Sequence, residues 1–121
     1  MAAEHLKLGA DGEAVASAYL TALGYDVRER NVRFGRQEID IVAFDPFERM
    51  IVFVEVKTRS HASQQYPIEL SVDWRKRRSL KKAIAQWVLK HAYEGPGRID
   101  VLCVCNGTVT KHLINIGTEH Y

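Results

Sequence analysis

Two neighbouring stretches, residues 37–44 and 50–59, are mainly apolar, and their charged residues recur at every second position, 38 and 40 in the first and 55, 57 and 59 in the second. Both stretches are rich in β-branched and aromatic residues, and residues 45–49 between them include the Asp-Pro pair typical of turns. Successive side chains of a strand point to opposite faces, so the charged residues Glu38 and Asp40 share one face of the first stretch. The pattern predicts a β-hairpin.

The register of this hairpin follows from keeping its two faces distinct, since a slip of one residue would mix them, which a half-buried sheet resists. With Phe44 opposite Ile51, one face pairs only apolar residues: Ile39 with Val56, Ile41 with Val54, and Ala43 with Val52. The other face begins with an apolar pair and ends with two charged pairs: Val42 with Phe53, Asp40 with Glu55, and Glu38 with Lys57.

The predicted pairing of Asp40 with Glu55 requires a positive charge nearby, because like charges directly opposite each other destabilise a sheet. A divalent cation bound by both carboxylates would supply it, with Lys57 as a second positive charge beside them. The alternative is a solvated strand end, in which a Glu38–Lys57 pair balances the charge. Spacing alone does not choose between these two interpretations.

Helical spacing describes two further segments. Residues 6–23 form a helix with a narrow polar stripe that includes Glu13, and with apolar residues around most of its circumference, so we expect the sheet to cover most of it. A second helix begins near Val72 or Asp73, with Ser71 or Asp73 as its N-cap, and ends at His91. Its expected core-facing stripe is Leu80, Ala83, Ile84, Trp87, Val88 and His91.

The other segments are predicted strands. Residues 25–34 alternate imperfectly, which favours an edge strand or a bulge. Residues 98–105 and 108–116 flank Asn106-Gly107, a strong signal for a hairpin turn. The predicted order α-β-β-β-α-β-β indicates an α/β fold, a central mixed five-stranded sheet flanked by helices, with residues 1–121 as one domain.

Composition adds little to the predicted fold, but it bears on solubility, membrane contact and cellular location. With 46% hydrophobic and 26% charged residues the chain is typical of a soluble globular protein, and no apolar run approaches the roughly 20 residues that span a bilayer. Cys103 and Cys105 lie two apart in a predicted strand, a poor arrangement for a disulfide. We therefore expect core cysteines, a cytoplasmic location and no membrane contact.

The net charge of +2 conceals a basic block. Residues 73–82 contain six basic residues and one acidic residue, so the block carries +5 and the rest of the chain −3. Such a block on a slightly acidic body suggests contact with a polyanion, although basic blocks are often solvated faces. The nucleic-acid-binding residues that we predict, here and in the other basic segments, are Arg33, Arg36, Arg59, Arg75, Lys76, Arg78 and Lys82.

Glu13 on the first helix, Asp40 on a strand and Glu55-x-Lys57 on the next strand resemble the PD-(D/E)XK nuclease superfamily, and within it the branch of archaeal Holliday-junction resolvases. Nearly the whole chain, from Gly12-Glu13 through the hairpin to residues 98–101, resembles the YraN-like family of small bacterial proteins. Gln37 departs from that family, which usually has glycine there; the glycine is not a ligand in the superfamily.

The resemblance implies a restriction-endonuclease-like fold and a catalytic set of Glu13, Asp40, Glu55 and Lys57. Asp40, Glu55 and the carbonyl of Val56 would bind Mg²⁺ or Mn²⁺, with Glu13 as a direct or water-mediated ligand. Lys57 would orient the attacking water and stabilise charge developing on the phosphate. Hard carboxylate oxygens suit these hard cations.

Two functions remain open on this evidence. The first is a metal-dependent endonuclease that hydrolyses phosphodiester bonds in DNA, with branched or otherwise structured DNA as one substrate class. The second is a non-catalytic nucleic-acid-binding module that retains the fold, since fold alone does not establish function. Resolvase-like relatives work as dimers, so the resemblance also leaves a homodimer open.

Overall fold

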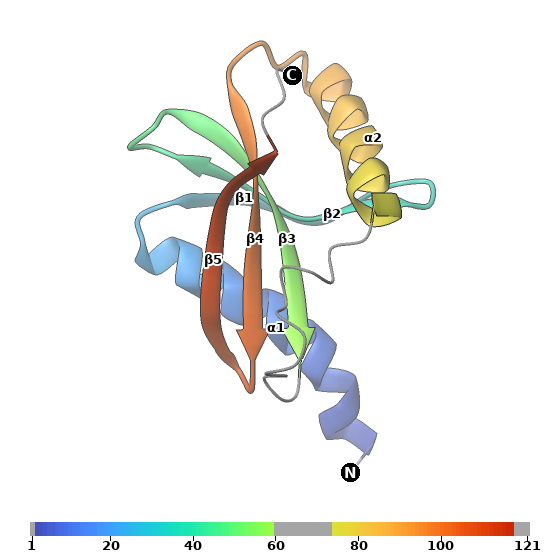
Figure 1. The fold of residues 1–121 in the computed structure, drawn as a ribbon, viewed down its shortest axis with the longest axis vertical. Coiled ribbons are helices and arrows are strands. Elements are labelled where there is room, and N and C mark those ends of the chain that lie inside the picture. The colour runs from blue at the N-terminus through green and yellow to red at the C-terminus, as the bar shows by residue number, and fades with distance from the viewer. Residues whose placement is uncertain (1, 60–73, 118–121) are drawn as a thin grey trace.

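The fold consists of two helices and one five-stranded sheet (Figure 1). The computed structural model describes the backbone of residues 2–59 and 74–117, and the side chains of residues 12–59 and 75–116. The elements in chain order are α1 (Ala2–Ala22), β1 (Asp26–Phe34), β2 (Gln37–Asp45), β3 (Met50–Arg59), α2 (Trp74–His91), β4 (Gly97–Cys105) and β5 (Thr108–Gly117). This order confirms the predicted α/β architecture. The predicted N-cap of the second helix, Ser71 or Asp73, lies outside the described residues.

The sheet is mixed, and its strands lie side by side in the order of the chain. All neighbours are antiparallel except β3 and β4, which are parallel and are joined through α2. A parallel pair needs such a crossover, and a helix is its usual form. β1 is an edge strand with a bulge between Val27 and Glu29, as its imperfect alternation predicted. Asn106 and Gly107 both have positive φ, 51° and 77°, as the predicted two-residue turn requires.

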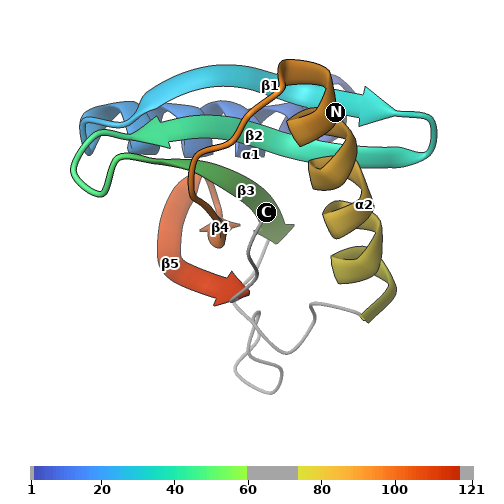
Figure 2. The same ribbon diagram turned by 90° about the horizontal axis from the view of Figure 1, so that it is seen from above.

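The two helices cover opposite sides of the sheet: α1 crosses behind the strands in Figure 1, and α2 lies over β1 and β2, as the view from above also shows (Figure 2). Phe53 packs edge-on against Trp87 of α2, with ring centroids 5.3 Å apart. Ala16 and Leu20 of α1 pack on the other side with Ile41 and Val54. Within the described residues, no helix is both long and apolar enough to cross a membrane.

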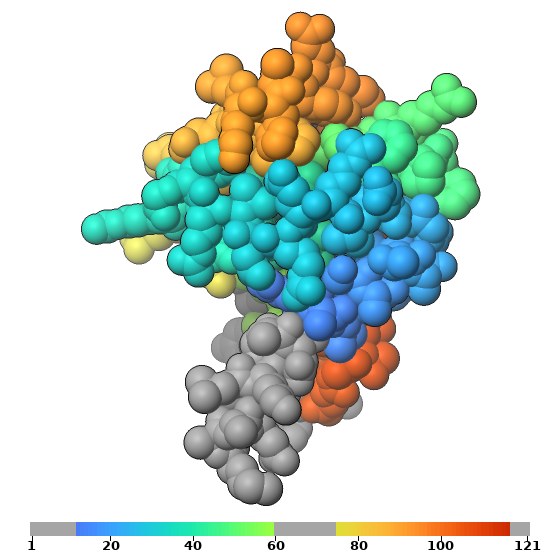
Figure 3. All heavy atoms as spheres, turned by 180° about the vertical axis from the view of Figure 1, so that it is seen from behind, coloured from blue at the N-terminus to red at the C-terminus, as the bar shows by residue number. Residues whose placement is uncertain are grey.

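The prediction that the sheet covers most of α1 is wrong. Among the side chains of α1 that the structure describes, residues 12–22, only the stripe of Gly12, Ala16 and Leu20 is buried, whereas Ala14 and Ala18 are exposed, as is Leu23 directly after the helix. Residues four apart lie above one another on a helix, so one such stripe is enough to dock α1 on the sheet. From behind, the described part of α1 and β1 are both visible at the surface (Figure 3). His91, predicted to face the core, is also exposed, and its ring stacks at the edge of the core on Trp87 at 4.4 Å.

The predicted register of the β2–β3 hairpin is confirmed for every pair from Phe44–Ile51 to Ile41–Val54. The ladder ends there, so the three predicted pairs beyond it, Asp40–Glu55, Ile39–Val56 and Glu38–Lys57, are not formed as strand pairs. On the other side of β2, Arg30 pairs with Ile41 and Val32 with Ile39, but Asn31 between them has a left-handed backbone, φ 53°. Asp40 therefore lies at a point where both neighbouring strands depart from regular pairing.

Candidate functional site

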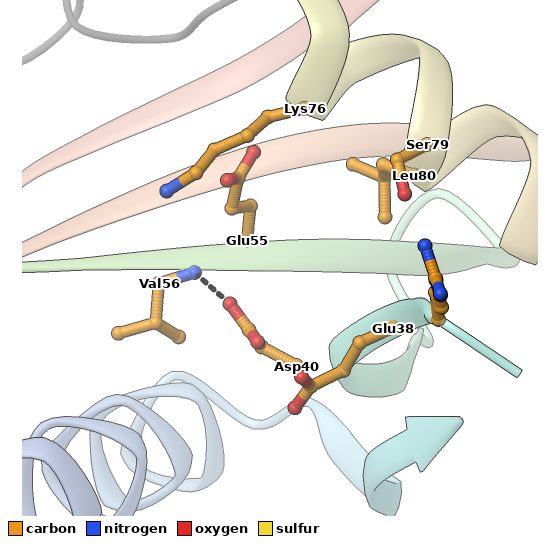
Figure 4. Close-up of a pocket in the computed structure, with 8 residues that line it drawn as sticks. Glu38, Asp40, Glu55, Val56, Lys76, Ser79 and Leu80 are labelled. Atoms are coloured by element: carbon orange, nitrogen blue, oxygen red, sulfur yellow. Dashed lines mark hydrogen bonds between the residues drawn. The ribbon is translucent and has the colours of Figure 1, made fainter. Parts of the chain in front are cut away.

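A pocket of about 280 Å³ opens between the irregular part of the hairpin and the first turns of α2 (Figure 4). Its walls carry three carboxylates, two cations and a few neutral groups. The lining residues are Arg36, Glu38, Asp40, Glu55, Val56, Lys76, Ser79 and Leu80. Of the residues predicted from the sequence to hold a metal, three are in this lining: Asp40, Glu55 and Val56.

Asp40 is held in place by the backbone of the next strand. Its Oδ2 accepts a hydrogen bond from the Val56 N–H at 2.8 Å, which replaces the ladder bonds missing at this point (Figure 4). Burial, opposed by that hydrogen bond and reinforced by the charges of Glu13, Glu38 and Glu55, raises the pKa of Asp40 to about 6. A carboxylate so destabilised in its charged form gains from a nearby cation.

Glu13 and Glu38 join Asp40 to form the carboxylate cluster, in which one oxygen from each residue lies within 4.8 Å of the others. Burial, together with the charge of Glu38, raises the pKa of Glu13. The Asn31 side chain opposes that shift through a hydrogen bond to Glu13. Asn is among the few residues other than glycine that tolerate a positive φ, so the kink in β1 also supplies this contact.

Gly12 sets how closely α1 can approach β3 next to this cluster. A Cβ at this position would overlap Thr58 Oγ1 and lie 3.2 Å from Thr58 Cβ, on β3. Only a glycine lets the helix backbone come this near to the strand. The next residue, Glu13, is thereby carried to the carboxylate cluster from the α1 side of the sheet.

Glu55 and Lys57 form an ion pair next to the cluster. Glu55 Oε1 lies 3.2 Å from Lys57 Nζ, and the two side chains are only 14% and 10% exposed. Glu38, which the predicted register paired with Lys57, instead lies 3.5 Å from Arg33. The second oxygen of Glu55, Oε2, is buried and has no hydrogen-bond partner among the described atoms. Such an atom normally has a partner, so it marks a place where a ligand or water would bind.

Lys76 is the site residue whose role the sequence did not reveal. We predicted it only as one member of a basic block. In the structure it lines the pocket together with Ser79 and Leu80, which follow it on α2 by three and four residues. Figure 4 shows its side chain extending from α2 alongside Glu55. Direct contact with Lys57, then charge repulsion from it, lowers the pKa of Lys76. Helical spacing from Leu80, a core residue, is the signal that would have placed Lys76 here.

The donor set of the carboxylate cluster fits a hard divalent cation. Three carboxylates within 4.8 Å offer several oxygens to one ion, and Mg²⁺ and Mn²⁺ favour such oxygen ligands. The composition of the group differs from that expected: Glu38 is in it, and Glu55 is not among the residues that meet the 4.8 Å distance. A cation shared by Asp40, Glu55 and the Val56 carbonyl remains a prediction.

Of the other predicted nucleic-acid-binding residues, Arg36, in the turn before β2, also lines the pocket, and the rest lie outside the lining. Arg75, Arg78 and Lys82 are exposed and share one side of α2, as predicted, beside the side that carries Lys76 and Ser79. Arg33 is exposed next to Glu38. Arg59 is partly buried at the end of β3.

Comparison with known proteins places this chain in a family. Proteins named "UPF0102 protein" align with it in Pelobacter propionicus (41% identity over 88% of this chain and 76% of the relative) and Chlorobaculum parvum (38% over 88% and 81%). A third, in Chlorobium limicola, is 37% identical over 94% of this chain and 88% of its own length. The profile described as "Uncharacterised protein family UPF0102" matches residues 12–104, from the glycine beside Glu13 to the second-last residue of β4. The chain is therefore a member of family UPF0102.

Proposed function

We propose that this protein is a metal-dependent endonuclease that hydrolyses phosphodiester bonds in DNA, with Mg²⁺ or Mn²⁺ as its cofactor. One observation carries the proposal: two members of the carboxylate cluster, Glu38 and Asp40, line the same pocket as Lys76, which is in contact with Lys57. A phosphodiester bound to a metal needs this combination of charges. The resemblance to the PD-(D/E)XK superfamily supports the same chemistry.

When bound, a divalent cation supplies Lewis-acid polarisation of the phosphoryl oxygen and lowers the pKa of a bound water. Asp40, Glu38 and Glu13 would hold it, and the Val56 N–H keeps the Asp40 carboxylate in position. Lys57 is fixed by Glu55, so its ammonium group is oriented before substrate binds. Preorganised charges of this kind stabilise a transition state without rearrangement.

The reaction is a displacement at phosphorus. The oxygen of a water molecule forms a bond to phosphorus, and the bond between phosphorus and the leaving sugar oxygen breaks. One proton leaves the water and one proton is taken up by the leaving oxygen, so the products are a phosphomonoester and a free hydroxyl. The ammonium group of Lys57 would offset the negative charge that develops on the phosphate.

The exposed stripe of Arg75, Arg78 and Lys82 would bind the rest of the nucleic-acid strand. It lies next to the pocket-facing side of α2, so a strand whose phosphate enters the pocket passes these side chains. Replacing all three by alanine should weaken DNA binding for every sequence and reduce the slope of log K against log salt by about three units. An unchanged slope would show that the stripe is only a solvated face.

A non-catalytic nucleic-acid-binding module is the second candidate. The observation that favours it is the Glu55–Lys57 ion pair, which leaves Glu55 outside the carboxylate cluster. In this case the carboxylates and basic residues bind a cation and DNA, but no bond is broken.

A cleavage assay separates the two candidates. Linear, flapped and four-way DNA are incubated with the wild type, Glu55→Gln and the matched control Glu48→Gln, an exposed glutamate in the β2–β3 turn. An endonuclease requires Mg²⁺ or Mn²⁺, loses roughly 100-fold or more of its rate in Glu55→Gln, and is unaffected by Glu48→Gln. Without metal, Glu55→Gln should bind DNA at least as tightly as the wild type, because a negative charge has been removed. No cleavage of any substrate would support the binding module, and undiminished cleavage by Glu55→Gln would indicate a contaminating nuclease.

A further inference from the structure

Among the described cations of α2, Lys76 alone lines the pocket. Its neighbours Arg75 and Arg78 are exposed outside the lining. Lys76 extends along Glu55, on the far side of β3 from Asp40 and Glu38 in Figure 4. The helix thus delivers one cationic side chain to the side of the pocket that faces the carboxylate cluster.

Lys76 lies against another positive charge. Lys57 is 8% exposed, and Lys76, which is itself exposed, is in contact with it, so two ammonium groups meet at the edge of the pocket. Glu55 is close to both, but it is a single carboxylate and its paired oxygen is directed to Lys57. Two ammonium groups in contact repel each other, and a negative charge bound by both would relieve that repulsion.

A phosphate would supply that charge. A phosphodiester carries one negative charge on two non-bridging oxygens, so it can contact a cation in the carboxylate cluster through one oxygen and an ammonium group through the other. Lysine suits this role because its ammonium is a compact charge with three rotatable donors, which does not require the planar geometry of a guanidinium.

We infer that Lys76 is a second substrate-contacting cation of this site, which with Lys57 binds the phosphate that is cleaved. The inference rests on the proposed function, since it assigns the substrate contact of the same pocket. It makes α2 part of the active site: the helix contributes a side chain to the reacting phosphate in addition to its exposed basic stripe. It also explains why two ammonium groups are held together in the free protein.

Single variants test the role of Lys76 in cleavage. Lys76→Met removes the charge and keeps the length of the side chain, and Lys76→Arg keeps the charge. Lys90→Met is the matched control, an exposed lysine on the same helix roughly 20 Å further along its axis. With Mn²⁺ and a DNA substrate we expect kcat to fall about 100-fold in Lys76→Met, to recover in part in Lys76→Arg, and to stay within about twofold in Lys90→Met.

A second measurement needs no cleavage and no metal. The wild type is treated with an amine-acetylating reagent in the presence of a chelator, with and without a DNA duplex, and acetylation of each lysine is quantified by mass spectrometry. DNA should protect Lys76 several-fold more than Lys90. Equal labelling of Lys76 with and without bound DNA, or full activity of Lys76→Met, would overturn the inference and leave the endonuclease proposal intact. Protection of Lys76 without any cleavage would keep the phosphate contact and reject the endonuclease, and a wild type that neither binds nor cleaves DNA would reject both.

Discussion

Two groups of carboxylates in this protein have opposite environments. In the carboxylate cluster, Glu13, Glu38 and Asp40 lie together, and burial with mutual repulsion raises the pKa of Asp40 to about 6. In a second group, on β2 and β4, Asp45 and Asp100 are buried around the guanidinium of Arg98. There burial acts to raise both pKa values, but hydrogen bonds outweigh it and lower them.

The second group, which we call the Arg98 network, has a partner for each of its charges. Arg98 lies 2.8 Å from Asp45 and 3.0 Å from Asp100, and it also donates to the Tyr25 hydroxyl at 2.9 Å. His112 Nε2 lies 2.7 Å from Asp100 Oδ2; because a carboxylate only accepts, this nitrogen carries the proton. The network joins the β2–β3 turn, β4 and β5.

The comparison teaches how to separate a binding site from a structural network when both consist of charged residues. In the Arg98 network every acid is paired, so its charged form stabilises the fold. In the carboxylate cluster three acids lie together, and burial with mutual repulsion raises the pKa values of Asp40 and Glu13, so an added cation would stabilise their charged forms. Raised pKa values such as those of the carboxylate cluster are typical of functional sites.

The largest expected effect is on the Arg98 network. Arg98→Met should reduce the free energy of unfolding by about 3–5 kcal/mol, because it leaves two buried carboxylates without their cation. The matched control is Arg28→Met, which removes an exposed ion pair to Asp26 and should cost less than about 1 kcal/mol. Urea denaturation at pH 7 measures both. Equal, small losses would show that the network contributes no more than a surface pair.

In the carboxylate cluster, removal of a charge should increase the free energy of unfolding. Asp40→Asn keeps an acceptor for the Val56 N–H and removes a charge, so without metal it should raise the free energy of unfolding at pH 8 by about 1–3 kcal/mol. Because the folded pKa of Asp40 is about 6 and its ordinary value is 3.8, the cost of its ionisation is complete above pH 6 and disappears below about pH 4. The gain in Asp40→Asn should follow the same window. A variant less stable than the wild type at pH 8 would contradict the repulsion.

Added metal should make the wild type more stable than Asp40→Asn. Mn²⁺ at 100 times its dissociation constant should stabilise the wild type by about 2.7 kcal/mol, seen as a higher melting temperature, and should have little effect on Asp40→Asn. Binding should strengthen as the pH rises through 6, where Asp40 becomes charged. Calorimetry that finds undiminished Mn²⁺ binding by Asp40→Asn would exclude the cluster as the metal site.

Acid should weaken the Arg98 network. The pKa values of Asp45 and Asp100 are lowered in the folded protein, so their stabilisation is complete above the ordinary value of 3.8 and is lost as the pH falls below it toward the folded values. Each carboxylate then contributes a slope of up to about 1.4 kcal/mol per pH unit. Denaturation curves between pH 2 and 5 should show this loss in the wild type and a shallower loss in Arg98→Met. Parallel curves for the two proteins would mean that Arg98 does not set these pKa values.

The smallest expected effect concerns Asn31, which connects the backbone kink to the cluster. Asn31→Ala should cost about 1 kcal/mol more than Asn31→Gly, because alanine is strained at φ 53° and glycine is not. Both variants lose the hydrogen bond to Glu13, so the pKa of Glu13 should rise further in both. Urea denaturation and a titration followed by NMR test the two parts separately. Equal stability of the two variants would show that the left-handed backbone at this position is not under strain.

The periodicity of apolar residues and the turn residues predicted most of the fold. The hairpin register from Phe44–Ile51 to Ile41–Val54, the crossover helix and the Asn-Gly turn all follow from periodicity and turn chemistry, which depend on residues close in sequence. The prediction failed where the pattern itself breaks, at Asn31 and Asp40. An alternation rule assumes an uninterrupted ladder, and it extended the pairing to Asp40–Glu55 where the strands had already separated.

The sequence by itself determined which chemistry is available: carboxylates for a hard cation, lysine beside them, and a basic helix after them. The tertiary structure decided the partners. It brought Glu38 rather than Glu55 into the carboxylate cluster, paired Glu55 with Lys57, and carried Lys76 from α2 to the pocket. The reason is physical: spacing along a strand fixes which face a side chain takes, whereas contact between a helix and two strands depends on packing, on the close approach at Gly12 and on a kink that only the folded chain contains.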